Sequence, residues 1–290
     1  NVGRTARHLT FFEMLGNFSF GDYFKHESLR WGMEFCEEWL EMDREKIWAT
    51  VYLDDDEAER IWVEELGMPK ERVVRLGKED NFWEHGTGPC GPCSEIHIDR
   101  GEEYGCGKPD CKPGCDCDHY MEFWNHVFTQ FNKKEDGTYV ELENKNIDTG
   151  MGLERLTVIV QEVDNVFETD TMQQIIDEIT RLTGSKYKDN AKDDRLIRIV
   201  TDHIRSITFL IADGVIPSNE GRGYVLRKLL RRASNQMRGL GLERPALDEL
   251  SKVVMVAYGE AYPQLLDRKD VILQTIKIEE EKFHQTLRKG

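Results

Sequence analysis

The sequence predicts an α+β protein in which a mostly antiparallel sheet flanked by helices precedes an all-helical region. Up to about residue 160, strand-like runs are interrupted by amphipathic segments, without the regular alternation that builds a parallel sheet. From Gln161 onward, apolar residues recur at helical spacing. We place the domain boundary near residue 164, which divides the chain into residues 1–163 and 164–290.

Four runs in the first region have the character of strands. They contain spaced aromatic or β-branched residues, or alternate polar with apolar side chains, and they cover residues 11–24, 48–53, 95–99 and 122–131. Two segments between them have apolar residues three and four positions apart. We predict helices there, at residues 29–41 and 55–66.

The second region contains a series of predicted amphipathic helices. Apolar residues three and four apart mark residues 171–182, 195–212, 224–237 and 250–262. A last segment, residues 270–287, places four apolar side chains on one face and the acidic run Glu279–Glu281 mainly on the others. The pattern predicts a helix that extends toward a partner outside this sequence.

The composition is that of a soluble globular protein. Of the 290 residues, 39% are hydrophobic and 32% are charged, which allows a substantial core in one large or two ordinary domains. The formal charge of -16 argues against a general nucleic-acid binder but leaves room for a local basic face. No stretch has the length of a membrane span and no secretory signal begins the chain, so we expect a cytoplasmic protein. Because the first residue is Asn1, we interpret the chain as a piece of a longer protein.

The octet from Asp148 to Arg155 is the most specific local pattern. Glycines at 150 and 152 let the backbone pass close to a ligand, and the helix predicted to follow presents Arg155 in its first turn. A strand-to-helix turn with a surface arginine is an equally open interpretation of this octet alone. The run from Glu122 to Phe128 is likewise open, since a buried strand with one hydrogen-bonded Asn would have the same pattern.

Four stretches occur together in one order along the chain: residues 11–25, 88–95, 148–155 and 219–227. With them the chain closely resembles the alanyl-tRNA synthetase family of class II synthetases. The resemblance implies an antiparallel class II catalytic sheet followed by a helical domain that recognises the acceptor stem of tRNA. It also implies a reaction in which L-alanine is activated with Mg²⁺ and ATP and is then transferred to the 3′ end of tRNA(Ala).

The resemblance carries roles onto particular residues. Arg155 is the implied catalytic residue and meets the ATP phosphates and adenine, and Gly152 borders ATP. Asp148 is implied to bind the ammonium of alanine, because an ammonium removed from water needs a counter-charge. The resemblance also implies that four further residues contact the nucleotide: Trp83, Phe123, Trp124 and Asn125. Of these, Asn125 is implied to contact alanine as well.

Two departures from the family pattern are visible near the start of the chain. The arginine that the family places on the α-phosphate would precede Asn1, and Leu9 follows His8 where the family often has a second histidine. Catalysis of this kind depends on positioning and on arginine and Mg²⁺ electrostatics. We therefore expect the chain alone to activate alanine poorly, and we place any proofreading activity beyond Gly290.

A basic window lies in the helical region. Seven Lys and Arg residues between 222 and 244 share the window with one acid, Glu243, and several are four positions apart. A solvated helix face would look the same. The resemblance implies instead an acceptor-stem reader, in which Asn219 approaches a G·U pair from the minor groove. The residues assigned to tRNA are Asn219, Arg222, Arg227 and Arg231, with Asp202 as a weaker candidate.

Six of the seven cysteines fall into two groups. Cys106, Cys111, Cys115 and Cys117 lie in a short Gly/Pro-containing loop, and four thiolates so close in sequence could wrap a tetrahedral Zn²⁺. Their spacing is not the common paired CxxC, so free thiols remain an alternative. For Cys90 and Cys93, which do form a CxxC, we favour a tight turn beside the active site.

Two rival functions stay open at this point. A non-catalytic tRNA-binding or regulatory relative would fit the absent arginine and Leu9, although RNA binding alone would not require Asp148, Asn125, Gly152 and Arg155 together. A metal-binding interaction module would rest on the cysteine loop alone. The sequence gives no basis for an oligomeric state.

Overall fold

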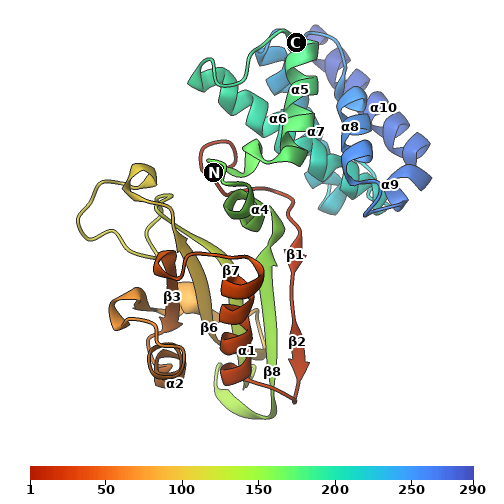
Figure 1. The fold of residues 1–290 in the computed structure, drawn as a ribbon. Coiled ribbons are helices and arrows are strands. Elements are labelled where there is room, and N and C mark those ends of the chain that lie inside the picture. Colours follow the sequence, from red (N-terminus) through yellow and green to blue (C-terminus); the bar gives the residue numbers. More distant parts are fainter. The chain divides into compact units, whose positions relative to one another are not determined.

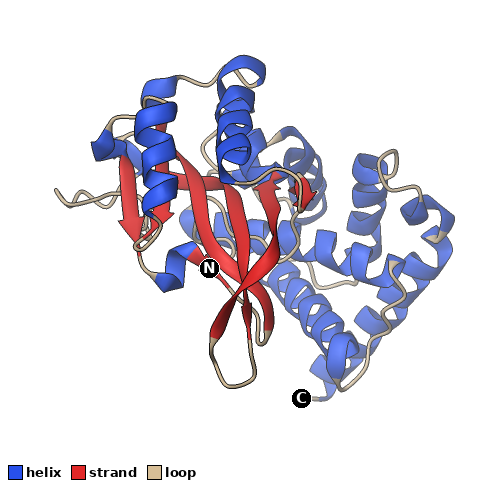
Figure 2. Cartoon of the chain, turned by 90° about the horizontal axis from the view of Figure 1, so that it is seen from below, coloured by secondary structure: helices blue, strands red, loops and turns tan.

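The computed structural model describes residues 1–290, which form two compact units (Figure 1). The sheet unit is Glu13–Val160, and the helical unit combines Asn1–Phe12 with Gln161–Gly290. All strands belong to the sheet unit, and the other unit consists of helices and loops (Figure 2). The predicted α+β character followed by helices therefore describes the secondary structure of the two units correctly.

The sheet has eight strands in the order β1-β8-β7-β6-β3-β4, with β2 also on β8 and β5 on β6. Every pair is antiparallel except β3 with β4, which a helical crossover joins in parallel, so the sheet is mixed rather than antiparallel throughout. The strands are β1 (Met14–Leu15), β2 (Phe18–Phe20), β3 (Ile47–Tyr52), β4 (Val73–Leu76), β5 (Phe82–Trp83), β6 (Gly88–Asp99), β7 (Tyr120–Lys133) and β8 (Tyr139–Gly152).

Two helices of the sheet unit end in a wider, π-helical turn. They are α1 (Lys25–Glu34), continued by Phe35–Trp39, and α2 (Asp56–Arg60), continued by Ile61–Glu65. Both predicted helices are confirmed in these places. The unit also contains α3 (Lys78–Asn81), α4 (Leu153–Gln161, which ends in the helical unit) and 3-10 turns at Arg44–Lys46, Lys70–Arg72 and Glu102–Tyr104.

The helical unit is built around α6, in which most residues are buried. A 3-10 turn at Val166–Glu168 precedes its helices, which are α5 (Asp170–Thr183), α6 (Ala191–Ala212), α7 (Gly221–Gly239), α8 (Leu247–Tyr258), α9 (Gln264–Asp267) and α10 (Lys269–Lys289). Ile204 and Ile207 of α6, Leu230 of α7 and Leu250 of α8 are fully buried, so apolar faces of several helices share one core.

The first twelve residues belong with the helices, which differs from the predicted division at residue 164. Thr10 donates from its backbone N to Asp202 Oδ1 at 2.7 Å, and the Phe11 ring stacks on Phe209 at 4.4 Å between centroids. Arg205 donates to the carbonyl oxygen of Phe11 at 2.9 Å. These contacts link sequence positions nearly two hundred residues apart, which local periodicity cannot reveal.

The acidic run of α10 is a second difference from expectation. Ile272 and Ile276 are buried as predicted, but Glu279 and Glu280 are buried with them at 3% and 1% exposure. Glu280 Oε1 accepts hydrogen bonds from the backbone N–H of Ala246 and Leu247, where α8 begins. A helix N-terminus offers unpaired donors and partial positive charge, which compensates the buried carboxylate.

Candidate active site

Strand β7 presents two different faces of the sheet. Trp124, His126 and Phe128 alternate along it, and His126 Nδ1 lies 2.9 Å from the Ser28 hydroxyl of α1. Asn125 and Val127 point to the opposite face, because successive side chains of a strand alternate. The Asn125 face, as we call it, is therefore distinct from the face that α1 covers.

Asn125 and Asp148 are diagonal neighbours on this face. In the ladder between β7 and β8, Asn125 pairs with Gly150 and Val127 pairs with Asp148. The backbone positions of such diagonal neighbours are roughly 7–8 Å apart, so the two side chains can contact one small ligand. The structure thus brings together the two residues that the sequence analysis assigned to alanine.

Burial is unfavourable for a polar group of each of these two residues. Asn125 Oδ1 is buried and has no hydrogen-bond partner. Partial burial raises the pKa of the Asp148 carboxyl, because the charged form loses part of its hydration. An ammonium would satisfy both, since it donates hydrogen bonds and supplies a positive charge.

The glycines of the octet differ in their surroundings. A Cβ on Gly150 would lie 2.5 Å from the terminal methyl of Met14, the flexible end of an exposed side chain that can move aside. A Cβ on Gly152 would meet Arg155 only at 3.8 Å, which is ordinary contact. The contacts at Gly150 and Gly152 therefore do not by themselves require glycine, and the assignment of Gly152 to ATP stays a prediction.

Arg155 lies at the first turn of α4, directly after β8 ends at Gly152. Its Nη1 donates to the carbonyl oxygen and to Oε2 of Glu122, both at 2.8 Å. Glu122 pairs across the ladder with His97, whose Nε2 lies 3.1 Å from Glu95 Oε1. The arginine is therefore held beside a row of ionisable groups on the Asn125 face.

Further carboxylates increase the negative potential of this region. Glu95 also accepts from the Thr50 hydroxyl at 3.2 Å. Burial, and after it the charge of Glu95, raises the pKa of Asp80. Sequence analysis missed Glu95 and Asp80, although the alternation of residues 95–99 placed Glu95 on a polar face.

The assignment of Trp124 and Phe123 to the nucleotide requires both side chains to lie on the Asn125 face, and neither does. The Trp124 ring packs edge-on against Phe35 at 5.8 Å between centroids, on the side covered by α1. There it lines a cavity of about 500 Å³ together with Tyr23, Trp31 and other residues. Phe123 is 1% exposed, at a bulge of the β6–β7 ladder, and so belongs to the core. We correct both assignments accordingly, because alternation sends Trp124 away from Asn125.

Trp83 lies on β5, where it pairs with Gly91 of β6, and 47% of its surface is exposed. A Cβ on Gly91 would lie 1.8 Å from the carbonyl oxygen of Phe128, so only glycine permits this approach of strands. The segment of Cys90 and Cys93 is therefore an irregular, bulged part of β6 rather than the expected tight turn. Burial raises the pKa of the Cys93 thiol to about 12.

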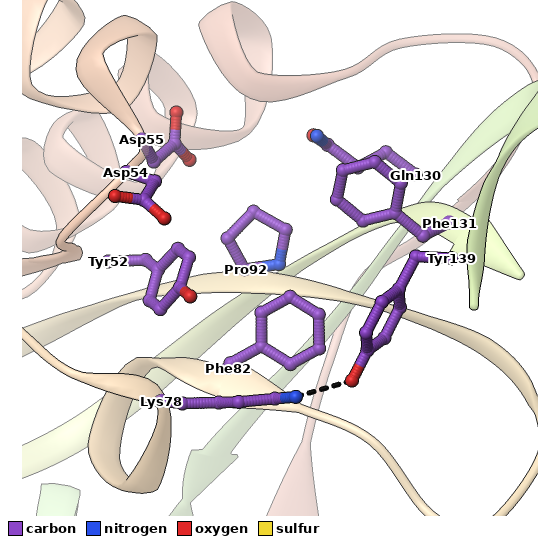
Figure 3. Close-up of a pocket in the computed structure, with 9 residues that line it drawn as sticks. All are labelled: Tyr52, Asp54, Asp55, Lys78, Phe82, Pro92, Gln130, Phe131 and Tyr139. Atoms are coloured by element: carbon purple, nitrogen blue, oxygen red, sulfur yellow. Dashed lines mark hydrogen bonds between the residues drawn. The ribbon is translucent and has the colours of Figure 1, made fainter. Parts of the chain in front are cut away.

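A second cavity of the sheet unit, of about 260 Å³, lies beside β5 (Figure 3). Lys78 donates to the Tyr139 hydroxyl at its wall. Four of the nine lining side chains are aromatic: Tyr52, Phe82, Phe131 and Tyr139. None of the residues that line it was assigned to a ligand from the sequence.

The residues assigned to tRNA are divided between surface and interior. Asn219 and Arg222 are exposed. The guanidinium of Arg227 forms hydrogen bonds within the helical unit. Its Nε donates to Glu279 at 2.7 Å and its Nη1 donates to Asn219 Oδ1 at 2.6 Å. Arg231 Nη2 lies 3.7 Å from the same Glu279 carboxylate.

Asp202 does not have the exposure that contact with RNA requires. Its side chain is fully buried, its Oδ2 accepts from the Thr10 hydroxyl, and His203 Nδ1 lies 2.7 Å away. The carboxylate therefore serves the core of the helical unit, and its assignment to tRNA is wrong for this structure.

The four cysteines of the loop between β6 and β7 converge in space. The sulfur atoms of Cys106, Cys111, Cys115 and Cys117 all lie within 4.8 Å of one another, an arrangement compatible with a metal site.

None of the helices of the chain has both the length and the apolar character that crossing a bilayer requires.

Comparisons with known proteins identify a family that covers the whole chain. A family model described as "tRNA synthetases class II (A)" matches residues 1–290. The chain is similar to proteins named "Alanine--tRNA ligase" from Clostridioides difficile (61% identity), Alkaliphilus oremlandii (61%) and Acetivibrio thermocellus (60%). Each match covers 100% of this chain and 33% of the relative, so the chain spans about a third of the length of these relatives.

Proposed function

The chain belongs to the family of class II (A) tRNA synthetases, and we propose that it is the part of an alanine–tRNA ligase that binds alanine and ATP. In the proposed reaction, a carboxylate oxygen of L-alanine attacks the α-phosphorus of ATP. The bond from that phosphorus to the oxygen bridging to the β-phosphate breaks, and diphosphate leaves. The alanyl group then passes to the terminal ribose of tRNA(Ala), and AMP leaves.

The observation that carries this proposal is the pair Asn125 and Asp148. Asn125 Oδ1 is a buried acceptor without a partner, and Asp148 is a carboxylate whose charge is disfavoured by partial burial. An α-ammonium placed between them would receive one hydrogen-bond acceptor and one counter-charge. Gly150, opposite Asn125, adds no side chain to this place. Such a site suits a small amino acid, whose methyl group offers little apolar surface for recognition.

The ion pair of Arg155 with Glu122 supports the proposed ATP site. Arg155 has a planar cation with several donors, which suits bidentate contact with phosphate oxygens. In the proposed complex, phosphate oxygens replace part of its present bonding to Glu122. The negative charge that develops on the phosphate then meets a cation already held in position by the start of α4.

Class II synthetases use ATP with Mg²⁺, and the oxygen donors of this face fit that cation. Mg²⁺ in nucleotide sites is held by one or two carboxylates together with phosphate oxygens. Glu95 and Glu122 are the carboxylates in place for this, near Arg155. The cation would supply neutralisation of the phosphate charge, while the residues of the chain orient alanine and nucleotide.

The exposed end of α7 is the proposed contact for the acceptor stem of tRNA. Arg222, Lys228 and Arg232 are exposed on this helix and carry the charge that phosphates require. Asn219, which precedes the helix, has an amide suited to the minor groove, although its Oδ1 now accepts from Arg227. Arg227 and Arg231 act in this proposal by shaping the surface through Glu279. Because aminoacylation uses cytosolic tRNA, we assign the protein to the cytoplasm.

Calorimetry with a non-hydrolysable alanyl-adenylate analogue, in which a sulfamoyl group replaces the phosphate, tests the proposal. We expect saturable binding at one site per chain and weaker binding of the glycyl analogue. Binding of tRNA with no binding of any aminoacyl-adenylate analogue would contradict the proposal and favour a non-catalytic tRNA-binding relative. Asp189→Asn, an exposed Asp of the helical unit, is the matched control for substitutions of Asp148.

A further inference from the structure

A long connection in the sheet unit has little apolar core of its own. It runs from Arg100 to His119, between the end of β6 and the start of β7. Its base is closed by a hydrogen bond from Arg100 N to the His119 carbonyl at 2.8 Å and by His119 Nε2, 2.9 Å from Asp99 Oδ1. Connections of this length in compact domains are uncommon without a function or a cross-link of their own.

Two consecutive four-residue turns, each with proline at its second position, shape this loop. In Lys108-Pro109-Asp110-Cys111, the Cys111 N–H donates to the Lys108 carbonyl at 3.2 Å. In Lys112-Pro113-Gly114-Cys115, the Cys115 N–H donates to the Lys112 carbonyl at 3.0 Å, and Gly114 has φ of 103°. Proline at the second position of a turn and glycine at the third are the residues that such turns select. Each turn ends on a cysteine, so the backbone itself aims two thiols into one place.

The sulfur geometry matches a tetrahedral thiolate site. The Sγ atoms of Cys106 and Cys115 are 3.9 Å apart, those of Cys111 and Cys117 are 3.3 Å apart, and all four lie within 4.8 Å. Four thiolates at the Zn–S bond length of about 2.3 Å would have sulfur atoms roughly 3.8 Å apart. The observed distances bracket this value.

Two disulfides would explain the loop less well. A disulfide needs only its own two sulfur atoms close together, at about 2.05 Å, and does not bring a second pair to the same point. All seven cysteines of the chain have free thiols in the structure. Convergence of four sulfurs in a largely solvent-exposed loop is the arrangement expected when one ion holds them together.

We propose that Cys106, Cys111, Cys115 and Cys117 bind one Zn²⁺ in a closed four-thiolate site that orders the connection between β6 and β7. Zinc is the divalent ion that a tetrahedral set of four cysteines selects. Four protein ligands leave no coordination position for water or substrate, so the site is structural rather than catalytic. It lies outside the proposed alanine site and does not depend on the proposed function.

Metal analysis of the purified 290-residue chain, prepared in reductant without chelators, tests this site. We expect about one zinc per chain in the wild type and in the control Cys90→Ala. The double variant Cys111→Ser/Cys117→Ser should contain less than about 0.1 zinc per chain, because it lacks two of the four ligands of a single closed site. Cys90 lies on β6, outside the loop. Far-UV circular dichroism of the double variant should retain the helix and sheet signals, because those elements have their own core.

Cobalt substitution gives a second readout that a misfolded variant cannot imitate. The Co²⁺-loaded chain should absorb intensely in the near ultraviolet and in the visible, as tetrahedral cobalt thiolates do, and the double variant should not. Several outcomes would overturn the proposal: no zinc in the wild-type chain after reconstitution, iron in place of zinc, a mass lower by four hydrogens from two disulfides, or full zinc content in the double variant.

Discussion

Arg155 donates from one nitrogen to both the backbone carbonyl and the carboxylate of Glu122, each at 2.8 Å. The contact joins the first turn of α4 to β7, the strand that carries Asn125. Asp148 lies on β8, the strand paired with β7. The contact of Arg155 with Glu122 fixes the direction of a cation before any phosphate is present, which is the kind of preorganisation that electrostatic catalysis requires.

Replacement of Arg155 should weaken nucleotide binding with little effect on folding. A hydrogen bond to a charged group contributes about 1.5–3 kcal/mol, so Arg155→Ala should lower the affinity for the alanyl-adenylate analogue by about 10- to 100-fold. Arg155→Lys should recover only part of this, because lysine lacks the planar fork. Titration calorimetry measures the affinity and urea denaturation measures the stability. A wild-type affinity in Arg155→Ala would remove Arg155 from the proposed site.

His126 should make the stability of the sheet unit depend on pH. It is fully buried, and desolvation lowers its pKa from 6.5 to about 3. The unfolded chain therefore binds a proton below pH 6.5 that the folded chain binds only near pH 3, so stability is lost as the pH falls through this range. Between pH 7 and pH 5 the loss from this residue is about 2 kcal/mol.

Urea unfolding of the wild type and of His126→Leu at pH 7 and pH 5 isolates this contribution. The variant should be less sensitive to pH over this interval by about 2 kcal/mol, whatever its stability at pH 7. Equal pH dependence in the two proteins would mean that His126 is protonated in the folded state or does not titrate on unfolding.

Glu280 should stabilise the helical unit by capping α8. Its carboxylate accepts from Ala246 N, Leu247 N and the Ser234 hydroxyl, and removal of the charge leaves these donors weakly paired. Glu280→Gln should destabilise the chain by about 1–3 kcal/mol. Glu281→Gln, the exposed neighbour on the same helix, should be within about 0.5 kcal/mol of the wild type. Comparable losses in the two variants would contradict the capping role.

Exposed cations of α7 should contribute to tRNA binding through phosphate contact. Arg222→Gln or Lys228→Gln should reduce the slope of log affinity against log salt by about 0.7–0.9 for each lost contact. Lys186→Gln, an exposed cation outside α7, should leave the slope unchanged. Filter binding with tRNA(Ala) over a salt series provides the slopes. Unchanged slopes in both α7 variants would place the tRNA surface elsewhere.

Sequence patterns predicted the elements whose apolar residues are regularly spaced. They did not predict elements in which exposed polar residues interrupt that spacing, or buried polar residues that depend on distant partners. The strands near residues 48–53 and 122–131 and the long helices carry clear periodicity and are present. Strand β8 was recognised only as a turn near its end. Its outer residues are largely exposed, and only the short run from Val140 to Glu143 alternates apolar with polar residues there. The buried Glu279 likewise depends on a partner in another helix, Arg227, that no local pattern can supply.

The candidate site was predicted from family resemblance more than from periodicity. Asn125 and Asp148 do lie on one face, and this relation required the register of β7 against β8. Trp124 was assigned to the nucleotide, although strict alternation with Asn125 already indicated the opposite face. Asp202 failed because burial, rather than residue type, decides whether a carboxylate can reach RNA.

The affinity of the Asp148→Asn variant for the alanyl-adenylate analogue tests the central claim most directly. The substitution keeps the shape of the side chain and removes the counter-charge of the ammonium, so calorimetry should record a loss of about 10- to 100-fold relative to the wild type and to Asp189→Asn. Wild-type affinity in Asp148→Asn, with the fold intact, would contradict the assignment of this face to alanine.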